Sequence, residues 1–163
     1  MPEETQPHTE LHALIDQGVE LLLALEKLLL EERRALEQRE LEAITQCTED
    51  KSTLLEQIDA NFRARHQWLT AQGIDPSATG WQSFLQQQPA SIAELLGHSW
   101  QTLADTLQRV QKSSLINQQL VRRSQENTGR LLSILQGKNQ RSQLYSSSGQ
   151  SDSFSTQSHI GKA

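Results

Sequence analysis

Residues 92–134 read IAELLGHSWQTLADTLQRVQKSSLINQQLVRRSQENTGRLLSI, and this stretch decides the fold. Apolar or small side chains recur in it in unbroken steps of four and three residues, the spacing of one face of an amphipathic helix. These positions are Ile92, Leu96, Ser99, Leu103, Thr106, Val110, Ser113, Asn117, Leu120, Ser124, Asn127, Leu131 and Ile134. Ser91 and Glu94 resemble a capping box, and Gly137 is typical of a helix end. We therefore predict a helix over residues 91–136, roughly 67 Å long at ~1.5 Å per residue.

Four polar residues interrupt the apolar face of this helix, where a self-sufficient bundle would prefer Leu or Ile. They are Ser113, Asn117, Ser124 and Asn127. Polar residues in such a row can fix the register of packed helices or keep a surface ready for exchange. Alternatively, they simply face the solvent, and the sequence does not decide between the two interpretations.

Two further apolar rows precede this stretch. The first contains Leu11, Ile15, Gly18, Leu22, Leu25 and Leu29; the second contains Leu41, Ile44, Thr48, Lys51, Leu55, Ile58, Phe62, Arg65 and Leu69. The step of five residues from Leu36 to Leu41 breaks the phase, which indicates either a turn or a stutter in one long helix. We favour a turn, with helices over about 9–37 and 40–72, because two helices folded back on each other cover each other's apolar rows.

A connector over residues 73–90 follows the second helix. Gly73 favours a left-handed helix end, and Asp75-Pro76 cannot easily continue a helix. One short helix carrying Trp81, Phe84 and Leu85 would close one end of the bundle. The predicted fold is therefore all-α: an elongated antiparallel hairpin plus a long third helix, forming a three-helix, coiled-coil-like bundle over residues 1–136.

The last 27 residues, 137–163, contain eight serines and three glycines, so we predict a flexible tail. Its larger apolar residues are Leu144, Tyr145, Phe154 and Ile160. Burial of these four contributes about 6 to 12 kcal/mol. Fixing more than twenty residues of backbone, at ~1 to 2 kcal/mol each, costs more. The tail should therefore become ordered only where a partner supplies additional buried surface.

The composition favours helices and argues against several classes of function. Leucine occurs 25 times and aromatic residues make up 4% of the chain, as suits helices rather than strands. The net charge of -5 without a basic cluster argues against nucleic-acid binding. The longest apolar run, Leu21 to Leu25, is too short for membrane insertion. A single cysteine, Cys47, and an acidic N-terminal segment favour the cytoplasm.

Residues that would support catalysis do not occur in recognised patterns. Between His8 and His12 the glutamate is Glu10, whereas zinc-protease helices need it directly after the first histidine, and the remaining histidines are scattered. No glycine belongs to a phosphate-binding loop, and no serine lies in a G-x-S-x-G turn. We therefore predict no catalytic residues, no metal site and no cofactor, and expect that the protein is not an enzyme.

Three segments in this order carry a resemblance to a known family: Thr48–Leu55 (TEDKSTLL), Leu115–Leu120 (LINQQL), and Leu144-Tyr145 with Gly149. Together with the helix plan they resemble the FlgN family of cytoplasmic export chaperones. The resemblance implies that the chain binds the amphipathic C-terminal helices of the hook-associated proteins FlgK and FlgL. It also implies that it prevents their premature self-assembly and delivers them to the flagellar export apparatus.

The predicted client-binding residues lie on the third helix and in the tail. They are Asn117, Leu120, Ser124, Leu131, Ile134, Leu144, Tyr145, Phe154 and Ile160. The resemblance supplies only Leu144 and Tyr145, whereas Phe154 and Ile160 follow from the tail argument. The alternative is a structural coiled-coil protein that self-associates through the same rows and has no client. The tail distinguishes the two, because a structural rod does not need these apolar anchors.

Overall fold

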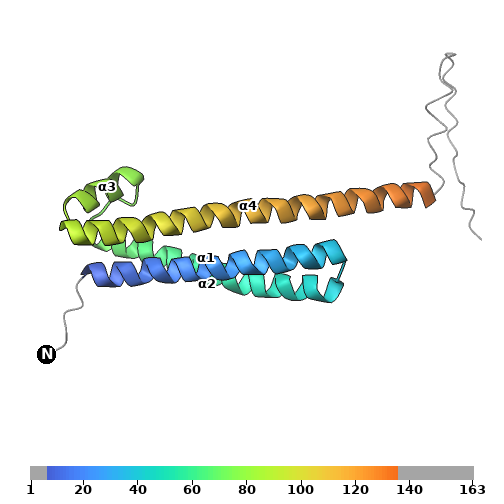
Figure 1. The fold of residues 1–163 in the computed structure, drawn as a ribbon, viewed down its shortest axis with the longest axis horizontal. Coiled ribbons are helices and arrows are strands. Elements are labelled where there is room, and N and C mark those ends of the chain that lie inside the picture. Colours follow the sequence, from blue (N-terminus) through green and yellow to red (C-terminus); the bar gives the residue numbers. More distant parts are fainter. Residues whose placement is uncertain (1–6, 136–163) are drawn as a thin grey trace, which may run out of the picture. The chain divides into compact units, whose positions relative to one another are not determined.

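The computed structural model describes residues 7–135, of which 91% are helical, and no strand occurs within this range. The helices are α1 (Pro7–Gln38), α2 (Leu41–Ala71), α3 (Ala78–Gln86) and α4 (Ala90–Leu135). The predicted all-α hairpin with a long third helix is confirmed (Figure 1). Within the described residues, 7–123 and 124–135 belong to two separate compact units. The tail predicted over residues 137–163 lies outside the described residues.

A turn, and not a stutter, separates α1 from α2. Arg39 adopts the left-handed conformation with φ 60°, and the Glu40 N–H donates to the Ala35 carbonyl at 3.0 Å. This is the hydrogen bond with which a left-handed residue usually closes a helix. No Gly or Pro marks this turn, because an arginine occupies the left-handed position, at a cost of roughly 1–2 kcal/mol.

The end of α2 has the same geometry with the residue type that favours it. Gly73 has φ 71°, and the Ile74 N–H donates to the Leu69 carbonyl at 2.9 Å. Ser77 then caps α3, since its side chain accepts a hydrogen bond from the Gly80 N–H. The predicted role of Gly73 is confirmed, and α3 occupies the connector.

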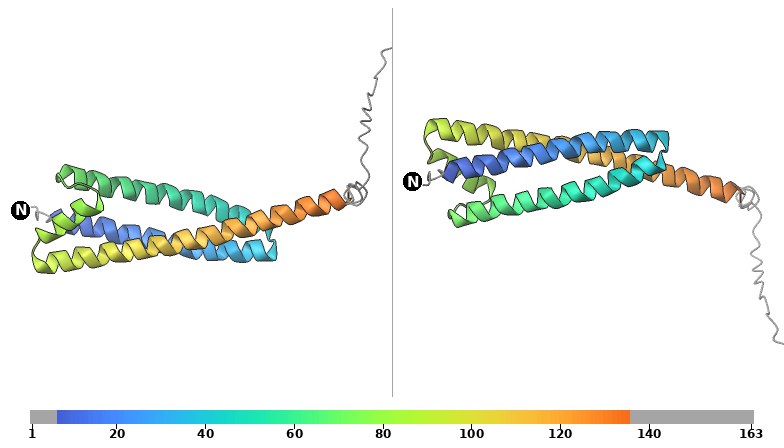
Figure 2. Two further views of the ribbon diagram at one scale, coloured as in Figure 1. Left: turned by 90° about the horizontal axis from the view of Figure 1, so that it is seen from above. Right: turned by 90° about the horizontal axis from the view of Figure 1, so that it is seen from below.

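The apolar row predicted for α1 forms the centre of the bundle. Leu11 and Ile15 are completely buried, and Leu22, Leu25 and Leu29 are nearly so. Figure 2 shows α1 beside both α2 and the first part of α4. Interhelical hydrogen bonds support this arrangement, because Asn61 of α2 and Asn117 of α4 both donate to carbonyls of α1.

The row predicted for α2 is confirmed in part, since Ile44, Lys51, Ile58, Arg65 and Leu69 are buried or half-buried. The side chains of α2 that are buried or half-buried are Ala43, Ile44, Cys47, Lys51, Leu54, Ile58, Asn61, Ala64, Arg65, Trp68 and Leu69. Leu41, Thr48, Leu55 and Phe62, which the sequence analysis placed in the row, are exposed. The prediction chose the row with more obvious apolar residues. The packed row also contains Asn61, whose partner, the Leu14 carbonyl of α1, is close only in the tertiary structure.

The first part of α4 packs as predicted, although the helix begins one residue before Ser91. Its buried residues are Leu96, Ser99, Leu103, Thr106, Val110, Ser113 and Asn117. The four polar residues of the row divide between the two interpretations. Ser113 and Asn117 are buried and hydrogen-bonded, whereas Ser124 and Asn127 are exposed.

Aromatic side chains close the end of the bundle near α3. Trp81 stacks on Trp100 of α4 with ring centroids 4.5 Å apart, and Phe84 packs edge-on against Trp68 of α2 at 6.4 Å. Such pairs contribute about 0.5–1.5 kcal/mol beyond their buried area. The short helix therefore joins α2 to α4, as expected for Trp81 and Phe84.

Candidate protein-binding surfaces

The last turns of α4 expose four large apolar side chains. Leu131, Leu132, Ile134 and Leu135 are 61%, 51%, 63% and 82% exposed. Two of them, Leu131 and Ile134, are predicted client-binding residues. Ser124, also predicted, is exposed, and Leu120 is half-buried. The structure thus leaves an apolar row on this segment available to a partner.

Asn117 has a different environment from the other predicted client-binding residues. Its side chain is 4% exposed and donates to the Leu29 carbonyl and to Glu32 Oε2, both at 2.8 Å. Arg33 donates to Asn117 Oδ1 at 3.1 Å. Asn117 therefore holds α4 against α1 and offers no exposed surface to a client in this conformation. Leu144, Tyr145, Phe154 and Ile160 lie outside the described residues.

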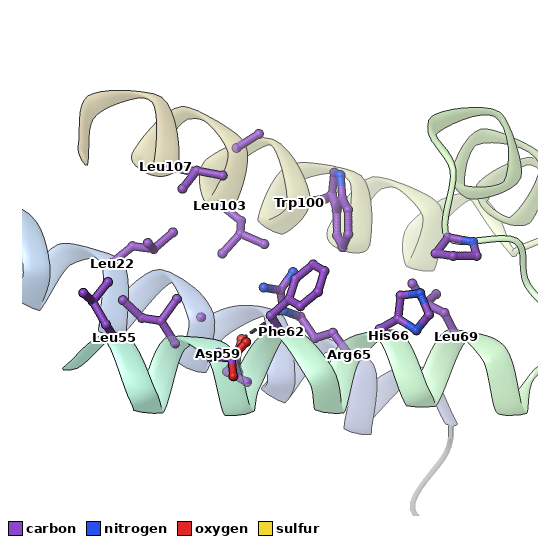
Figure 3. A pocket seen from close by; sticks show the side chains of 15 residues that line it. Leu22, Leu55, Asp59, Phe62, Arg65, His66, Leu69, Trp100, Leu103 and Leu107 are labelled. Carbon is purple, nitrogen blue, oxygen red and sulfur yellow. Dashed lines mark hydrogen bonds between the residues drawn. The ribbon is translucent and has the colours of Figure 1, made fainter. Parts of the chain in front are cut away.

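A groove between α2 and α4, about 570 Å³ in volume, is a second apolar surface (Figure 3). Leu55 and Phe62 contribute side chains from α2, and Trp100 and Leu107 from α4. The most exposed of them is Phe62, at 56%. Large exposed apolar side chains gathered along a groove are typical of a protein-binding surface.

The floor of the groove depends on Gly18 of α1. A Cβ atom at this position would lie 2.8 Å from Asn61 Oδ1 and 3.0 Å from Leu103 Cδ1. The missing side chain therefore allows α2 and α4 to approach α1 closely. Asn61 donates to the Leu14 carbonyl at 2.9 Å and fixes α2 at this level.

Arg65 places a positive charge inside the groove. Its Nε donates to Asn61 Oδ1 at 2.9 Å, and its guanidinium lies 5.8 Å from the Trp100 ring and 5.9 Å from the Phe62 ring. Burial lowers the pKa of Arg65, although an arginine remains charged at any physiological pH. Within residues 7–135, Arg65 forms no ion pair, and the nearby Asp59 pairs with Arg63.

The sequence analysis did not identify this groove. Leu55, Phe62 and Arg65 were assigned to the packed row of α2, and Leu107 lay off the row of α4. Adjacent apolar pairs such as Leu54-Leu55 and Trp68-Leu69 carried a usable signal. Neighbouring helix residues are about 100° apart, so each pair supplies two faces of the same helix.

Ser99, His12 and Asp16 approach one another in the order of a hydrolase triad. Ser99 Oγ lies 3.1 Å from His12 Nε2, and His12 Nδ1 lies 3.1 Å from Asp16 Oδ2. Ser99 is nevertheless buried in the interior of α4, where the backbone N–H groups are used by the helix. An acyl-transfer site needs free donors for the oxyanion and access for substrate. The arrangement fits a hydrogen bond that joins α1 to α4.

Neither a metal cluster nor a membrane span is found in the part of the chain that the structure describes. Residues 7–135 hold no group of three or more His, Cys, Asp or Glu side chains that could bind a metal ion. None of the helices in this range combines the length and apolar character needed to cross a membrane.

Comparison with known proteins identifies the family. The model of the FlgN protein family matches residues 8–153, which include α1 to α4. The chain belongs to the FlgN family. The match includes Leu144 and Tyr145 and ends before Phe154 and Ile160.

A solved member of similar structure supports this assignment. The chain is similar to a Pseudomonas aeruginosa protein assigned as the flagella synthesis protein FlgN, with 32% sequence identity and a TM-score of 0.62. The similarity covers 83% of this chain and 99% of the other. A search among curated protein sequences gives no match. Membership of the FlgN family supports a role related to the bacterial flagellum.

Proposed function

We propose that this member of the FlgN family is a cytoplasmic chaperone of the flagellar type III export system. It binds the amphipathic C-terminal helices of the hook-associated proteins FlgK and FlgL. By covering their apolar faces it prevents premature self-assembly, and it delivers them to the export apparatus. It works by binding alone, without catalysis, metal or cofactor.

The exposed apolar row at the end of α4 carries this proposal. Leu131, Leu132, Ile134 and Leu135 lie on one helix segment within the family match. Burial of each side chain against a client helix would contribute about 1.5–3 kcal/mol. A soluble monomer gains nothing from leaving such a row exposed, whereas a chaperone needs it for its client.

The tail completes the proposed binding surface. Leu144 and Tyr145 follow α4 closely in sequence and fall within the family match. They and the more distant Phe154 and Ile160 would fold over the bound client and add apolar contacts. Ordering the tail subtracts from the gross binding energy, so the affinity remains low enough for release at the export gate.

Isothermal titration calorimetry with synthetic C-terminal helices of FlgK and FlgL tests the proposal. We expect a discrete complex at tens of micromolar protein and weaker binding after truncation behind Gly137. Joint replacement Leu131→Ser and Ile134→Ser should also weaken binding. The matched control is Leu23→Ser, because Leu23 is an exposed leucine of α1 outside both surfaces.

The structural coiled-coil alternative predicts self-association and no binding of a client helix. In that case the exposed row of α4 pairs with the same row of a second copy. Light scattering would then show a mass that rises with concentration and falls in the Leu131→Ser and Ile134→Ser variant. Self-association of this kind, together with no heat on adding either client helix, would contradict the chaperone proposal.

A further inference from the structure

The groove between α2 and α4 has the dimensions of a helix-binding site. Leu55, Phe62 and Leu69 follow one another along α2 at intervals of about two helical turns. At ~1.5 Å per residue, the row from Leu55 to Leu69 is about 21 Å long, which equals about 14 residues of a bound helix. Apolar residues repeated every seven positions match the period with which one helix packs along another.

The arrangement of α1, α2 and α4 leaves room for one additional helix in the groove. Contacts of α1 with α2 join Glu32 to Lys51 and Glu10 to Trp68, so these two helices are antiparallel. Contacts of α1 with α4 join His12 to Ser99 and Arg33 to Ser113, so these two are parallel. The groove therefore lies between two antiparallel helices above α1. A helix placed there would complete a four-helix bundle.

The positive charge of Arg65 indicates that the occupant of the groove carries an acidic residue. Its guanidinium is half-buried between two aromatic rings, and it has no carboxylate partner within residues 7–135. A desolvated cation is stabilised by a carboxylate that can accept two hydrogen bonds. An occupant that carries an acidic residue at the level of Phe62 and Trp100 would supply this partner.

Charge argues against the chain's own exposed segments as occupants. Residues 122–135 contain Arg122, Arg123 and Arg130 but a single acidic residue, Glu126. Residues 137–163 contain Lys138, Arg141 and Lys162 but a single acidic residue, Asp152. Either segment would bring mainly positive charge towards Arg65, whether it came from the same chain or from a second copy.

We infer that the groove receives the client helix, as an amphipathic helix with an acidic residue paired to Arg65. The apolar face of this helix packs on Leu55, Phe62 and Leu107, over a floor formed by Leu22 and Leu103. The inference rests on the proposed function and adds the binding site and the charge of the client. The end of α4 and the groove are then two separate contributors to binding.

Apolar substitutions in the groove test its occupation. Fluorescence anisotropy with labelled C-terminal helix peptides of FlgK and FlgL measures the affinity of each full-length variant. Phe62→Gln and Leu107→Gln should each weaken binding at least ~10-fold, because apolar anchors in grooves act as hot spots. The control Leu30→Gln, at an exposed leucine of α1 that does not line the groove, should bind as the unmodified protein does. All three positions are exposed, so circular dichroism should show unchanged folding.

A matched pair of peptides tests the charge. One peptide has the natural sequence, and its twin has every Glu and Asp replaced by Gln and Asn. The unmodified protein should bind the twin ~10-fold more weakly, and Arg65→Gln should remove this difference. Arg65→Lys keeps the charge and should retain part of the preference, which separates the charge from the packing of Arg65.

The outcomes separate the groove from the chaperone proposal. If the unmodified protein binds a client peptide and Phe62→Gln and Leu107→Gln bind equally well, the groove is not the site and the chaperone proposal stands. Equal binding of both twins to the unmodified protein would overturn the pairing with Arg65. If neither client peptide binds the unmodified protein, both the chaperone proposal and the inference are overturned.

Discussion

The first part of α4 and its last twelve residues share a spacing of apolar side chains but differ in their surroundings. Leu96, Leu103 and Val110 are buried in the core, whereas Leu131 and Ile134 follow the same pattern and are exposed. The steps of three and four residues between these side chains are the same in the two segments. The difference shows that the spacing of apolar residues along a helix does not predict which of them are buried by a neighbouring helix.

The buried part of α4 is the part that packs along α1. The two helices are parallel, and hydrogen-bonded residues are 80 to 88 positions apart along their shared length. At this offset Gln38, the last residue of α1, lies level with about residue 122 of α4. Every residue from 121 to 132 is exposed. The length of α1 therefore decides which apolar residues of α4 become core and which remain available.

Shortening a leucine in each segment tests this difference most strongly. Leu103→Ala leaves a cavity between α1 and α4 and should lower the free energy of unfolding by about 2–5 kcal/mol. Leu131→Ala removes an exposed side chain and should change it by less than ~0.5 kcal/mol. Urea unfolding followed by circular dichroism measures both. Equal losses would mean that the end of α4 is covered in solution.

The asparagines of the two segments give a smaller contrast. Asn117→Leu removes one partner of Arg33 and one partner of Glu32, so we expect a loss of about 1–3 kcal/mol in the free energy of unfolding. Asn127→Leu lies on the exposed segment and should change it by less than ~0.5 kcal/mol. Thermal and urea unfolding provide the comparison. A loss at Asn127 as large as at Asn117 would show that both are packed.

Replacement by alanine should lower the stability at Gly18 and should not lower it at Gly129. At Gly18 the new Cβ would meet Asn61 and Leu103, so the ~1 kcal/mol gained in helix propensity is outweighed by overpacking of about 1–3 kcal/mol. At Gly129 an added Cβ would meet nothing within 4 Å beyond the backbone of its own helix, so Gly129→Ala should only raise the helix content. Melting curves recorded by circular dichroism should show a lower midpoint for Gly18→Ala alone.

Thiol reactivity should give the smallest effect. Burial, followed by the negative charges of Glu32 and Glu31, raises the pKa of Cys47. Less thiolate is therefore present at pH 8, and iodoacetamide should modify Cys47 more slowly than a cysteine at exposed position 124, made as Ser124→Cys with Cys47→Ser. Equal rates followed by mass spectrometry would contradict the burial of Cys47.

The raised pKa also sets the sign of a pH effect. The folded state holds the thiol proton more tightly than the unfolded state does. The contribution to stability is present below the ordinary thiol pKa of about 8.5 and is lost as the pH rises through the folded-state pKa. Cys47→Ser should lack this alkaline loss.

Local sequence signals were sufficient to predict most of the fold. They predicted little of the candidate protein-binding surfaces. Gly73 and the apolar period of α1 specify a helix end and a packed face through properties of single residues. The turn at Arg39 lacked such a signal, since an arginine occupies the left-handed position that glycine usually takes. Part of the packed face of α2 was missed because Asn61 looks like a solvent-facing residue until α1 supplies its partner, the Leu14 carbonyl.

By itself, the sequence determined that this protein is helical, where its long helices lie, and that more apolar side chains occur on them than one row requires. These properties depend on spacing along a single helix and on the local preferences of residues. Only the tertiary structure decided which rows are core, because burial depends on how far a neighbouring helix extends. It alone placed Arg65 between Phe62 and Trp100, since the three residues belong to two helices whose approach no local pattern records.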